Sequence, residues 1–555
     1  MKISQTGKSL ALCASLIIFN TVAAPLTPAD RDFIQQQQQQ RLQQDQQQRD
    51  AIWQAVSPPG RPVEAAGQPG PCFVINQIAV HNATLLSPRQ QQRLAAPYLH
   101  RCLNLASINA LVNRISNWYM QRGYITSRAF LTEQDLSSGT LTVQVLEGKV
   151  EAIHLEGKAS LMLRTVFPGV TGSILNLRDI EQGMEQINRV RTTPVQIDIQ
   201  PATHAGYSII NLTGKPEFPV GVTLGFDNSG QRSTGTGQVT GSLTANNLLG
   251  VADRWTLSGG RSSAFSPWHD AQNLQAGVSV PYGYGLLDYS YSWSNYRRSF
   301  VSDDFTWLSN GNNRAHRLNG SWVLFRNGDI KTGLDVGLNH YVSHNYLNSA
   351  LLQSSSRKMT SLQVGLNHTQ KIAGGVATLN PTFSRGMPWF DAESDQSKNG
   401  DLPKASFRKW SLTGSYQRPL TSRLWWLSSF YAQWSPDRLY SSERLTLGGE
   451  SSVRGYKEQY LSADAGGYLR NELNYTLFTL PWLGNVSALA AADGGWLKSD
   501  AQNSGFTGTL WGSAVGLATR NQHIYTQYTL AVPLSYPSYL QPDRVTVYAR
   551  VGLVF

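Results

Sequence analysis

The sequence predicts an antiparallel transmembrane β-barrel of about sixteen strands over residues 217–555, preceded by two small α/β units and an N-terminal helix. After about residue 215, apolar and polar residues alternate in many segments, which is typical of strands with lipid on one side and water on the other. No apolar run long enough for a membrane helix follows the N-terminus, so a membrane span would have to be built from strands. The alternation continues to the last residue, through Val545, Val547, Ala549, Val551, Leu553 and Phe555.

Residues 1–23 have the pattern of a signal peptide. Lys2 and Lys8 precede an apolar run over residues 10–19, and Thr21-Val22-Ala23 supplies the small residues of a cleavage site. We therefore expect the chain to leave the cytoplasm. The net charge of +11 is spread along the chain. Because we expect the chain to be exported, this charge does not indicate a nucleic-acid partner.

Removal of the signal peptide would leave two cysteines, Cys72 and Cys102. In the oxidising compartment that an exported chain enters, we expect them to form a disulfide, which would add roughly 3 kcal/mol to the free energy of unfolding. A metal site is not expected at this pair, because no second pair of ligands stands nearby. His340 and His344 do not indicate a metal site either, since no carboxylate lies between them.

Residues 24–54 are expected to form a helix. Thr27 at the cap, Pro28 at the first position and Asp30 in the first turn form a helix start, and the residues that follow are mostly glutamine. Such a segment is either a disordered polar tail or a plug, because a polar helix of this length spans roughly 40 Å and suits a water-filled lumen. The prolines and glycines of residues 55–70 indicate an extended linker that would keep a displaced plug tethered.

The first α/β unit is predicted over residues 71–149. A strand from Cys72 to Val80 precedes a helix that Ser87 caps, and strands over residues 127–132 and 140–145 close the unit. Between them lies a second helix with a buried apolar stripe made of Ile108, Leu111, Val112, Ile115 and Tyr119.

Residues 150–216 repeat this order in shorter form. Strands are predicted over residues 150–155, 195–199 and 207–212, and the helix between them has a buried stripe of Leu177, Ile180, Met184 and Ile187. Both units would leave sheet edges free. A free edge can bind an extended segment of another protein through backbone hydrogen bonds, with little demand on side chains.

The barrel region shows its alternation most clearly over residues 287–294, where Leu287, Tyr289, Tyr291 and Trp293 alternate with polar residues. Asn327-Gly328 is a tight hairpin signal between two further alternating segments. The same theme recurs at Leu424, Trp426, Phe430 and Trp434, with tryptophan near both ends of the segment.

A glycine-rich loop over residues 447–456 contains one arginine, Arg454, beside Val453, Gly455 and Tyr456. In a soluble protein this would be an ordinary surface turn. In a polar barrel lumen, the planar guanidinium could instead pair with a carboxylate of the wall. The expected partner is Asp493, on a strand of small residues that includes Gly495. Glycines beside both charges would let the backbones approach closely.

These motifs resemble those of the TpsB family of outer-membrane transporters of two-partner secretion, the haemolysin secretion/activation proteins. Val453-Arg454-Gly455-Tyr456 resembles the VRGY motif of the family, and Asp493-Gly494-Gly495 resembles the wall motif whose aspartate meets that arginine. Residues 122–129 and 177–183 resemble the signatures of the two POTRA domains that precede the barrel. The terminal Phe555 resembles the assembly signal of bacterial outer-membrane barrels.

The resemblance implies a bacterial outer-membrane protein with its N-terminal domains in the periplasm and a plug helix in the pore. The implied client is a large unfolded exoprotein of the TpsA class, which is a haemolysin, an adhesin or a contact-dependent toxin. It would dock on the POTRA edges and fold outside the cell. Outer-membrane lipids and lipopolysaccharide, the barrel-assembly machinery and periplasmic chaperones are further implied partners, and a single chain would form the pore.

Two other classes of function stay open. A barrel-assembly insertase would also use POTRA domains and an arginine loop, but such proteins usually carry more than two of these domains. An outer-membrane enzyme would need a nucleophile, and Gly449-Glu450-Ser451-Ser452-Val453 lacks the last glycine of a G-x-S-x-G elbow. The sequence also has no phosphate-binding loop, so we expect neither ATP hydrolysis nor a cofactor.

Overall fold

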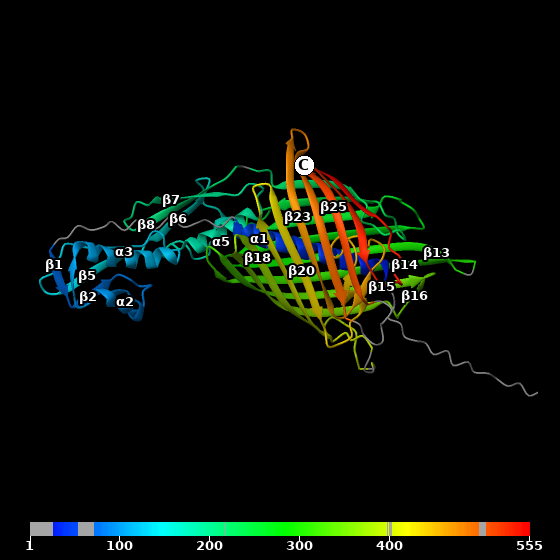
Figure 1. Cartoon of the computed structure of the whole chain (residues 1–555), viewed down its shortest axis with the longest axis horizontal. Coiled ribbons are helices and arrows are strands. Elements are labelled where there is room, and N and C mark those ends of the chain that lie inside the picture. The colour runs from blue at the N-terminus through cyan, green and yellow to red at the C-terminus, as the bar shows by residue number, and fades with distance from the viewer. Residues whose placement is uncertain are drawn as a thin grey trace, which may run out of the picture.

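A computed structural model describes residues 26–53, 71–215, 217–302, 304–396, 398, 402–498 and 507–555. The predicted signal peptide of residues 1–23 and the predicted linker of residues 55–70 lie outside these ranges. The predicted fold class is confirmed, because a closed antiparallel barrel follows two α/β units and an N-terminal helix (Figure 1).

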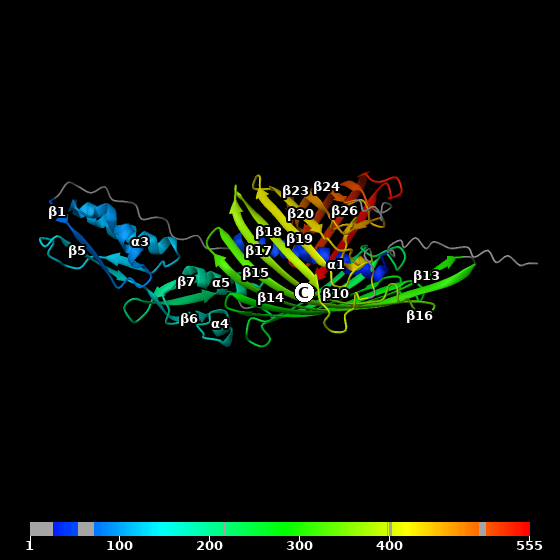
Figure 2. The same cartoon turned by 90° about the horizontal axis from the view of Figure 1, so that it is seen from below.

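The N-terminal helix α1 (Pro28–Trp53) runs through the interior of the barrel (Figures 1 and 2). It begins at the predicted cap, where the Thr27 hydroxyl accepts the backbone N–H of Asp30 at 3.1 Å. Since nearly all of its side chains are polar, the helix has no broad apolar face, and Ile34 and Ile52 are its buried aliphatic residues. None of the described helices is both long and apolar enough to cross a membrane.

The first α/β unit has more elements than the sequence predicts. It contains β1 (Cys72–Ile75), β2 (Gln77–His81), α2 (Pro88–Ala95), the 3₁₀ helix η1 (Ala96–Tyr98), β3 (Arg101–Asn104), α3 (Leu105–Gln121), β4 (Arg128–Phe130) and β5 (Thr140–Leu146). The capping of α2 by Ser87 is confirmed, and so is the buried stripe of α3, in which Val112 is partly exposed.

The prediction of one strand from Cys72 to Val80 is wrong. The chain breaks at Asn76, because the backbone N–H groups of Asn76 and Gln77 both donate to the Gly139 carbonyl, at 2.8 and 3.2 Å. As a result, β1 pairs with β3 in a small sheet of its own, while β2 runs parallel to β5 in the sheet β2-β5-β4.

The predicted disulfide between Cys72 and Cys102 is confirmed, and it joins β1 to β3 with the two Cα atoms 5.2 Å apart. Because the bridge closes a segment of the unfolded chain, replacing both cysteines by serine should lower the free energy of unfolding of this unit by roughly 3 kcal/mol. Hydrogen exchange of α3 in the full-length chain would measure the loss. The unmodified chain under reducing conditions should exchange like the variant, and unchanged protection in both would contradict the prediction.

The second α/β unit contains β6 (Lys149–Leu155), α4 (Leu161–Val166), α5 (Leu177–Asn188), β7 (Gln196–Pro201) and β8 (Tyr207–Thr213), with the sheet order β6-β8-β7. The stripe predicted for α5 is buried in the core of this unit. The short helix α4 is absent from the sequence-based prediction, because six residues are too few to show a helical period. Its Met162, Leu163 and Val166 complete the same core.

The two units meet at residues of their sequence signatures. The backbone N–H of Leu177 donates to the Gly123 carbonyl at 2.8 Å. Gly123 has a φ of +93°, and a Cβ at this position would lie 2.4 Å from Oδ1 of Asn176. The glycine is therefore required both by its backbone conformation and by the close approach of the second unit. Figure 2 shows the two units as an arm that extends from one end of the barrel.

Sixteen strands close the barrel, and each pairs with its neighbours in an antiparallel ladder. They are β9 (Val220–Asp227), β10 (Gln238–Asn246), β11 (Arg254–Ser262), β12 (Asp270–Tyr282), β13 (Gly285–Ser302), β14 (Phe305–Arg326), β15 (Ile330–Leu347), β17 (Arg357–Ile372), β18 (Gly375–Gly386), β19 (Arg408–Pro419), β20 (Leu424–Trp434), β23 (Gly466–Leu480), β24 (Gly484–Leu497), β25 (Thr509–Arg520), β26 (Ile524–Ser535) and β27 (Thr546–Val554). The two-residue strand β16 (Ala350–Leu351) is added at the end of β15.

The last strand closes the barrel against the first. β27 pairs with β9, and Phe555 extends the ladder because its N–H donates to the Val222 carbonyl at 2.8 Å and its carbonyl accepts the N–H of Val222 at 3.1 Å. An open strand edge in lipid would leave backbone groups without partners, so the terminal residue contributes directly to closure.

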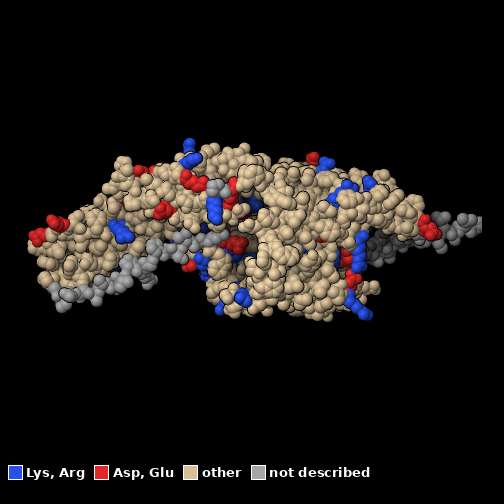
Figure 3. Space-filling view, turned by 90° about the horizontal axis from the view of Figure 1, so that it is seen from above, with Lys and Arg blue, Asp and Glu red and all other residues tan. Residues whose placement is uncertain are grey.

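The two ends of the barrel differ. Short turns join the strands at the end that carries the α/β units, here called the turn end, and the predicted hairpin at Asn327-Gly328 is one of them. Longer loops join the strands at the opposite end, here called the long-loop end. Alternate residues face outward, for example Leu287, which is 54% exposed, and Trp322, which is 51% exposed. In Figure 3 the middle of the barrel wall is almost free of charged side chains, which gather toward its ends.

Candidate functional site

The glycine-rich loop lies inside the barrel. The chain leaves β20 at the long-loop end, passes through the 3₁₀ helix η2 (Ser441–Glu443), and folds into the lumen as a small hairpin of β21 (Leu445–Leu447) and β22 (Leu461–Ala463). Residues 448–460 connect these two strands. An apolar cluster attaches the hairpin to the wall, since Leu447, Val453 and Leu461 pack with Tyr468 and Leu510, and all five are buried.

Arg454 and Asp493 form a bidentate ion pair at the centre of this contact. Nε of Arg454 donates to Oδ2 of Asp493 at 2.6 Å, one terminal nitrogen donates to Oδ1 at 2.6 Å, and the backbone N–H of Arg454 donates to Oδ2 at 3.1 Å. Arg454 is 2% exposed and Asp493 is 0% exposed. The fork-to-fork geometry gives both energy and orientation, so it holds the loop in one position against β24.

Two further charges complete the site. The other terminal nitrogen of Arg454 lies 3.0 Å from Oε1 of Glu472 on β23, and Arg470 on the same strand donates to that oxygen at 2.8 Å. Two arginines and two carboxylates therefore balance within one buried cluster. Arg470 and Glu472 are not among the residues that the sequence motifs indicate. The signal that could have revealed them is the pair of opposite charges two residues apart, which places both on the inward face of a barrel strand.

Close packing between the loop and the wall explains the glycines. Gly455 has a φ of +100°, and a Cβ there would lie 2.8 Å from the backbone N of Pro533. On the wall, a Cβ at Gly512 would lie 2.0 Å from the Arg454 carbonyl, and one at Gly495 would lie 2.8 Å from Leu447. The Tyr456 hydroxyl lies 2.7 Å from the Trp511 carbonyl and 2.9 Å from the Ser535 carbonyl, beside the register shift between β25 and β26.

The plug helix α1 is held by the loop as well as by the barrel wall. On the loop, Arg31 lies 3.5 Å from Glu458, and the Gln38 amide donates to the Thr446 carbonyl at 3.0 Å. Phe33 stacks on the ring of Tyr341, with 4.8 Å between the centroids. Further wall contacts are the hydroxyl of Tyr341 to Asp30 at 2.8 Å, Asn380 to Asp45 at 3.0 Å, Arg317 to Gln40 at 2.8 Å, and Arg49 to Gln417 at 3.1 Å.

Most of these contacts to α1 are hydrogen bonds between polar groups, for which water can substitute. A cavity of about 970 Å³ remains beside the helix, lined by α1, by α5 and by inward residues of several strands, most of them polar. Thr27, Pro28 and Asp30 lie at the long-loop end, where Gln231 donates to the Pro28 carbonyl at 3.0 Å. The arrangement is therefore a polar lumen that a polar helix largely fills.

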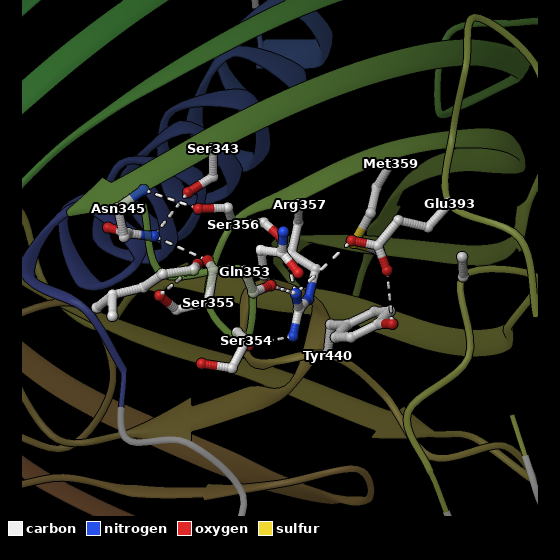
Figure 4. A network of polar contacts seen from close by, with 12 residues as sticks. Ser343, Asn345, Gln353, Ser354, Ser355, Ser356, Arg357, Met359, Glu393 and Tyr440 are labelled. Carbon is white, nitrogen blue, oxygen red and sulfur yellow. Dashed lines mark hydrogen bonds and ion pairs between the residues drawn. The ribbon is translucent and has the colours of Figure 1, made fainter. Parts of the chain in front are cut away.

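The base of the inward loop is clamped at the long-loop end (Figure 4). Tyr440 donates to Glu393 at 2.8 Å, and the centroid of its ring lies 4.7 Å from the Arg357 guanidinium and 4.9 Å from the Lys398 ammonium. Asn345 bonds the carbonyl of Ser355 at 2.8 Å and so orders the loop that leads to Arg357. This cluster is not predicted from the sequence, because its members come from β15, from the start of β17 and from loops that meet only in the folded barrel.

The second α/β unit docks on turns of the barrel through α4 and α5. Arg326 donates to Gln182 at 2.8 Å and to Glu185 at 2.6 Å, and Lys331 pairs with the same carboxylate. The Tyr284 hydroxyl donates to Asp179 at 2.5 Å. The 177–183 signature is thus shared between the core of its own unit, the first unit and the barrel.

The ion pairs of Glu185 with Arg326 and Lys331 should stabilise this junction over a wide pH range. Burial would raise the pKa of Glu185, but the charges of Lys331 and Arg326 outweigh burial and lower the pKa from 4.5 to about 2. Since the folded pKa is the lower one, the contribution to stability is complete above about pH 4.5 and is lost as the pH falls through about 2. Glu185→Gln should therefore weaken docking by about 1–3 kcal/mol at neutral pH.

Hydrogen exchange of α5 would measure the effect of Glu185→Gln. Asp198→Asn on β7 is the matched control, because that carboxylate contacts only the neighbouring Gln200 among the described residues. Equal exchange in both variants would contradict a role of Glu185 at the junction.

Neither the serine nor the histidines considered in the sequence lie in a catalytic or metal-binding arrangement among the residues that the structure describes. The pocket around Ser451 is lined by loop, α1 and wall residues and contains no histidine. His340 bonds the Thr360 hydroxyl at 2.9 Å, and His344 lies opposite Asn312 in the ladder. Within the described ranges, no group of three or more His, Cys, Asp or Glu side chains could hold a metal ion.

Comparison with known proteins agrees with this architecture. Residues 206–519 match the family described as haemolysin secretion/activation protein ShlB/FhaC/HecB, residues 73–148 match the ShlB-type POTRA domain, and residues 149–201 match a POTRA domain. The chain is 56% identical over 554 residues to the outer membrane transporter CdiB of Escherichia coli, covering 99% of this chain and 94% of that protein. It is 50% identical over 558 residues to CdiB of Dickeya dadantii (strain 3937), covering 100% of both.

More distant relatives and solved structures agree. The hemolysin transporter protein ShlB of Serratia marcescens is 29% identical over 457 residues, covering 82% of this chain and 80% of that protein. The solved structure of CdiB from Escherichia coli superposes with a TM-score of 0.94 at 56% identity, covering 96% of this chain and 100% of the other. The chain therefore belongs to the haemolysin secretion/activation protein family ShlB/FhaC/HecB, the TpsB-type outer-membrane transporters of two-partner secretion, with its barrel in the outer membrane and its POTRA domains in the periplasm.

Proposed function

We propose that this chain recognises a large unfolded exoprotein of the TpsA class through its POTRA domains and passes it through the barrel without ATP. The observation that carries the proposal is a lumen filled by a polar helix: α1 crosses the pore, and its contacts are mostly polar hydrogen bonds for which water can substitute. When the helix withdraws, an extended polypeptide can take its place. The relatives are named as transporters, not as enzymes, which supports a role without catalysis.

Client recognition would use the sheet edges of the POTRA domains. In the second domain β7 has one neighbour, β8, in the sheet order β6-β8-β7, so its other edge is open to an added strand. Gln196, Asp198 and Gln200 of β7 are exposed. Backbone pairing at such an edge tolerates many sequences, which suits a client that arrives unfolded.

The motif and the plug would act together in this function. Arg454 and Asp493 would hold the loop in the conducting arrangement, with Val453, Gly455, Tyr456 and Gly495 shaping the contact. The helix that Thr27, Pro28 and Asp30 begin would leave the lumen to admit the client. Folding of the client outside the cell would make its export unidirectional, and it would be the energy source of transport.

The client belongs to the haemolysins, adhesins or contact-dependent toxins of the TpsA class. The CdiB transporters of Escherichia coli and Dickeya dadantii are 50–56% identical to this chain, whereas the relatives named as hemolysin transporters are 29–30% identical and a CdiB-2 of Burkholderia pseudomallei is 28% identical. This difference favours the client class of CdiB transporters. We further propose that outer-membrane lipids and lipopolysaccharide surround a single barrel, and that periplasmic chaperones and the barrel-assembly machinery deliver it, with Phe555 in the assembly signal.

Site-specific photo-crosslinking during export tests this function. A photoreactive residue at Gln200, on the open edge of β7, should capture the exoprotein encoded beside this chain. The same residue at Gln92, on the exposed side of α2, is the matched control and should not. Equal capture from both positions would contradict recognition at the edge. Failure of the unmodified chain to place that exoprotein outside the cell would contradict the transporter function itself.

A further inference from the structure

Arg470 faces the same carboxylate that Arg454 binds. In the ladder between β23 and β24, Arg470 and Asp493 are directly opposite each other, so both side chains point into the lumen. Yet Asp493 gives both of its oxygens to Arg454, and Arg470 turns along its own strand to Glu472, at 2.8 Å.

The guanidinium of Arg470 is only partly used in this arrangement. Arg470 is 7% exposed, and its Nε and one terminal nitrogen are buried without a hydrogen-bond partner among the described residues. Buried donors of a charged group normally find acceptors, so free donors on an arginine beside a carboxylate cluster indicate unused binding capacity.

Withdrawal of the loop would change the charge balance of the site. With the loop in place, Arg454 and Arg470 balance Asp493 and Glu472. When Arg454 leaves, the wall keeps both carboxylates and one arginine. Directly opposite residues in an antiparallel pair have Cβ atoms about 4.5–5.5 Å apart, so the long side chain of Arg470 can reach Asp493 by rotation alone.

We propose that Arg470 replaces Arg454 on Asp493 when the loop of residues 447–456 leaves the wall. Arg470 is then a positioning residue that acts through Asp493. Because Asp493 would pass from one arginine to another instead of becoming a lone buried carboxylate, the exchange lowers the cost of moving the loop. The proposal deepens the role of the loop proposed above, and it concerns the wall of the barrel independently of any client.

A cycle of variants in the full-length chain tests the exchange. Arg470→Met keeps an unbranched side chain but removes the guanidinium and its charge, and Arg454→Ala releases the loop. The ratio of folded to unfolded barrel is measured by heat-dependent migration on electrophoresis. Arg470→Met should lower this ratio when Arg454 is present, because Glu472 then loses one of its two arginines, and should lower it roughly tenfold more in the Arg454→Ala chain, where both carboxylates lose their last arginine. The same change in both chains would overturn the proposal.

A second set of variants distinguishes an effect of Arg470 through Asp493 from an effect through Glu472. If Arg470 acts through Asp493, the extra effect of Arg470→Met should vanish in the chain that carries both Arg454→Ala and Asp493→Asn. Persistence of the effect there would mean that Arg470 acts through Glu472 alone, and would overturn the exchange. A structure of the Arg454→Ala chain provides the direct readout. Arg470 should lie within hydrogen-bond distance of Asp493, and a guanidinium that contacts only Glu472 would overturn the proposal. These measurements need no export, so their failure is distinguishable from failure of the transporter function.

Discussion

Arg454→Ala is expected to insert as a folded barrel and to lose most export of the client. The variant removes the two side-chain hydrogen bonds to Asp493 and the contact to Glu472. Removing one partner of a buried ion pair typically costs about 3–5 kcal/mol, so the loop should detach from β24. The strand ladders do not include Arg454, which is why the barrel itself should survive. Heat-dependent migration of the barrel and immunoblotting of the client outside the cell measure the two effects.

Two controls define what Arg454 contributes. Arg454→Lys keeps the charge but cannot bind Asp493 as a planar fork, so export should be intermediate or low. Arg423→Ala removes an exposed arginine from a turn at the other end of the barrel and should leave export unchanged. Normal export by Arg454→Ala would rule out the proposed role of the loop.

Deletion of residues 24–54 is expected to give a large and steady rise in ion conductance across a planar bilayer. The helix α1 occupies the lumen, and an α-helix with its side chains is about 10–12 Å wide. Its removal should therefore open a water-filled path next to the cavity of about 970 Å³ that already exists. The expected change is larger than any that a single substitution in the wall would cause.

Asp30→Ala offers a milder form of the same experiment. It removes the 2.8 Å hydrogen bond from Tyr341 while the rest of α1 stays in place, so brief openings are expected instead of a steady current. Asp50→Ala is the matched control on the same helix, because Asp50 is exposed. If neither the deletion nor the full chain forms a channel, the barrel is closed by other elements such as the inward loop, and the insertase alternative gains support.

Local patterns in the sequence predict much of the fold. The start of α1 follows from Thr27, Pro28 and Asp30, because a helix cap depends only on neighbouring residues. The stripe of α5 and the outward residues of the strands follow from periods of 3.6 and 2, which the backbone imposes on every helix and strand. Where local patterns compete, prediction fails: nothing near Asn76 reveals that its N–H turns to Gly139 and splits one strand into two.

The candidate site, like the fold, is predicted only in part by local patterns in the sequence. The sequence indicates Arg454 and Asp493, because an arginine on a glycine-rich loop and an aspartate among small residues are unusual in an alternating barrel. It does not indicate that Arg470 lies opposite Asp493, that Tyr440 is clamped between two loops, or that Glu185 meets Arg326. The first contact depends on the register of the β23–β24 hairpin, and the other two join residues far apart in the chain that meet only in the folded protein. Side-chain types and periods are properties of short segments, whereas the pairing of charges depends on strand register and on contacts between distant parts of the chain.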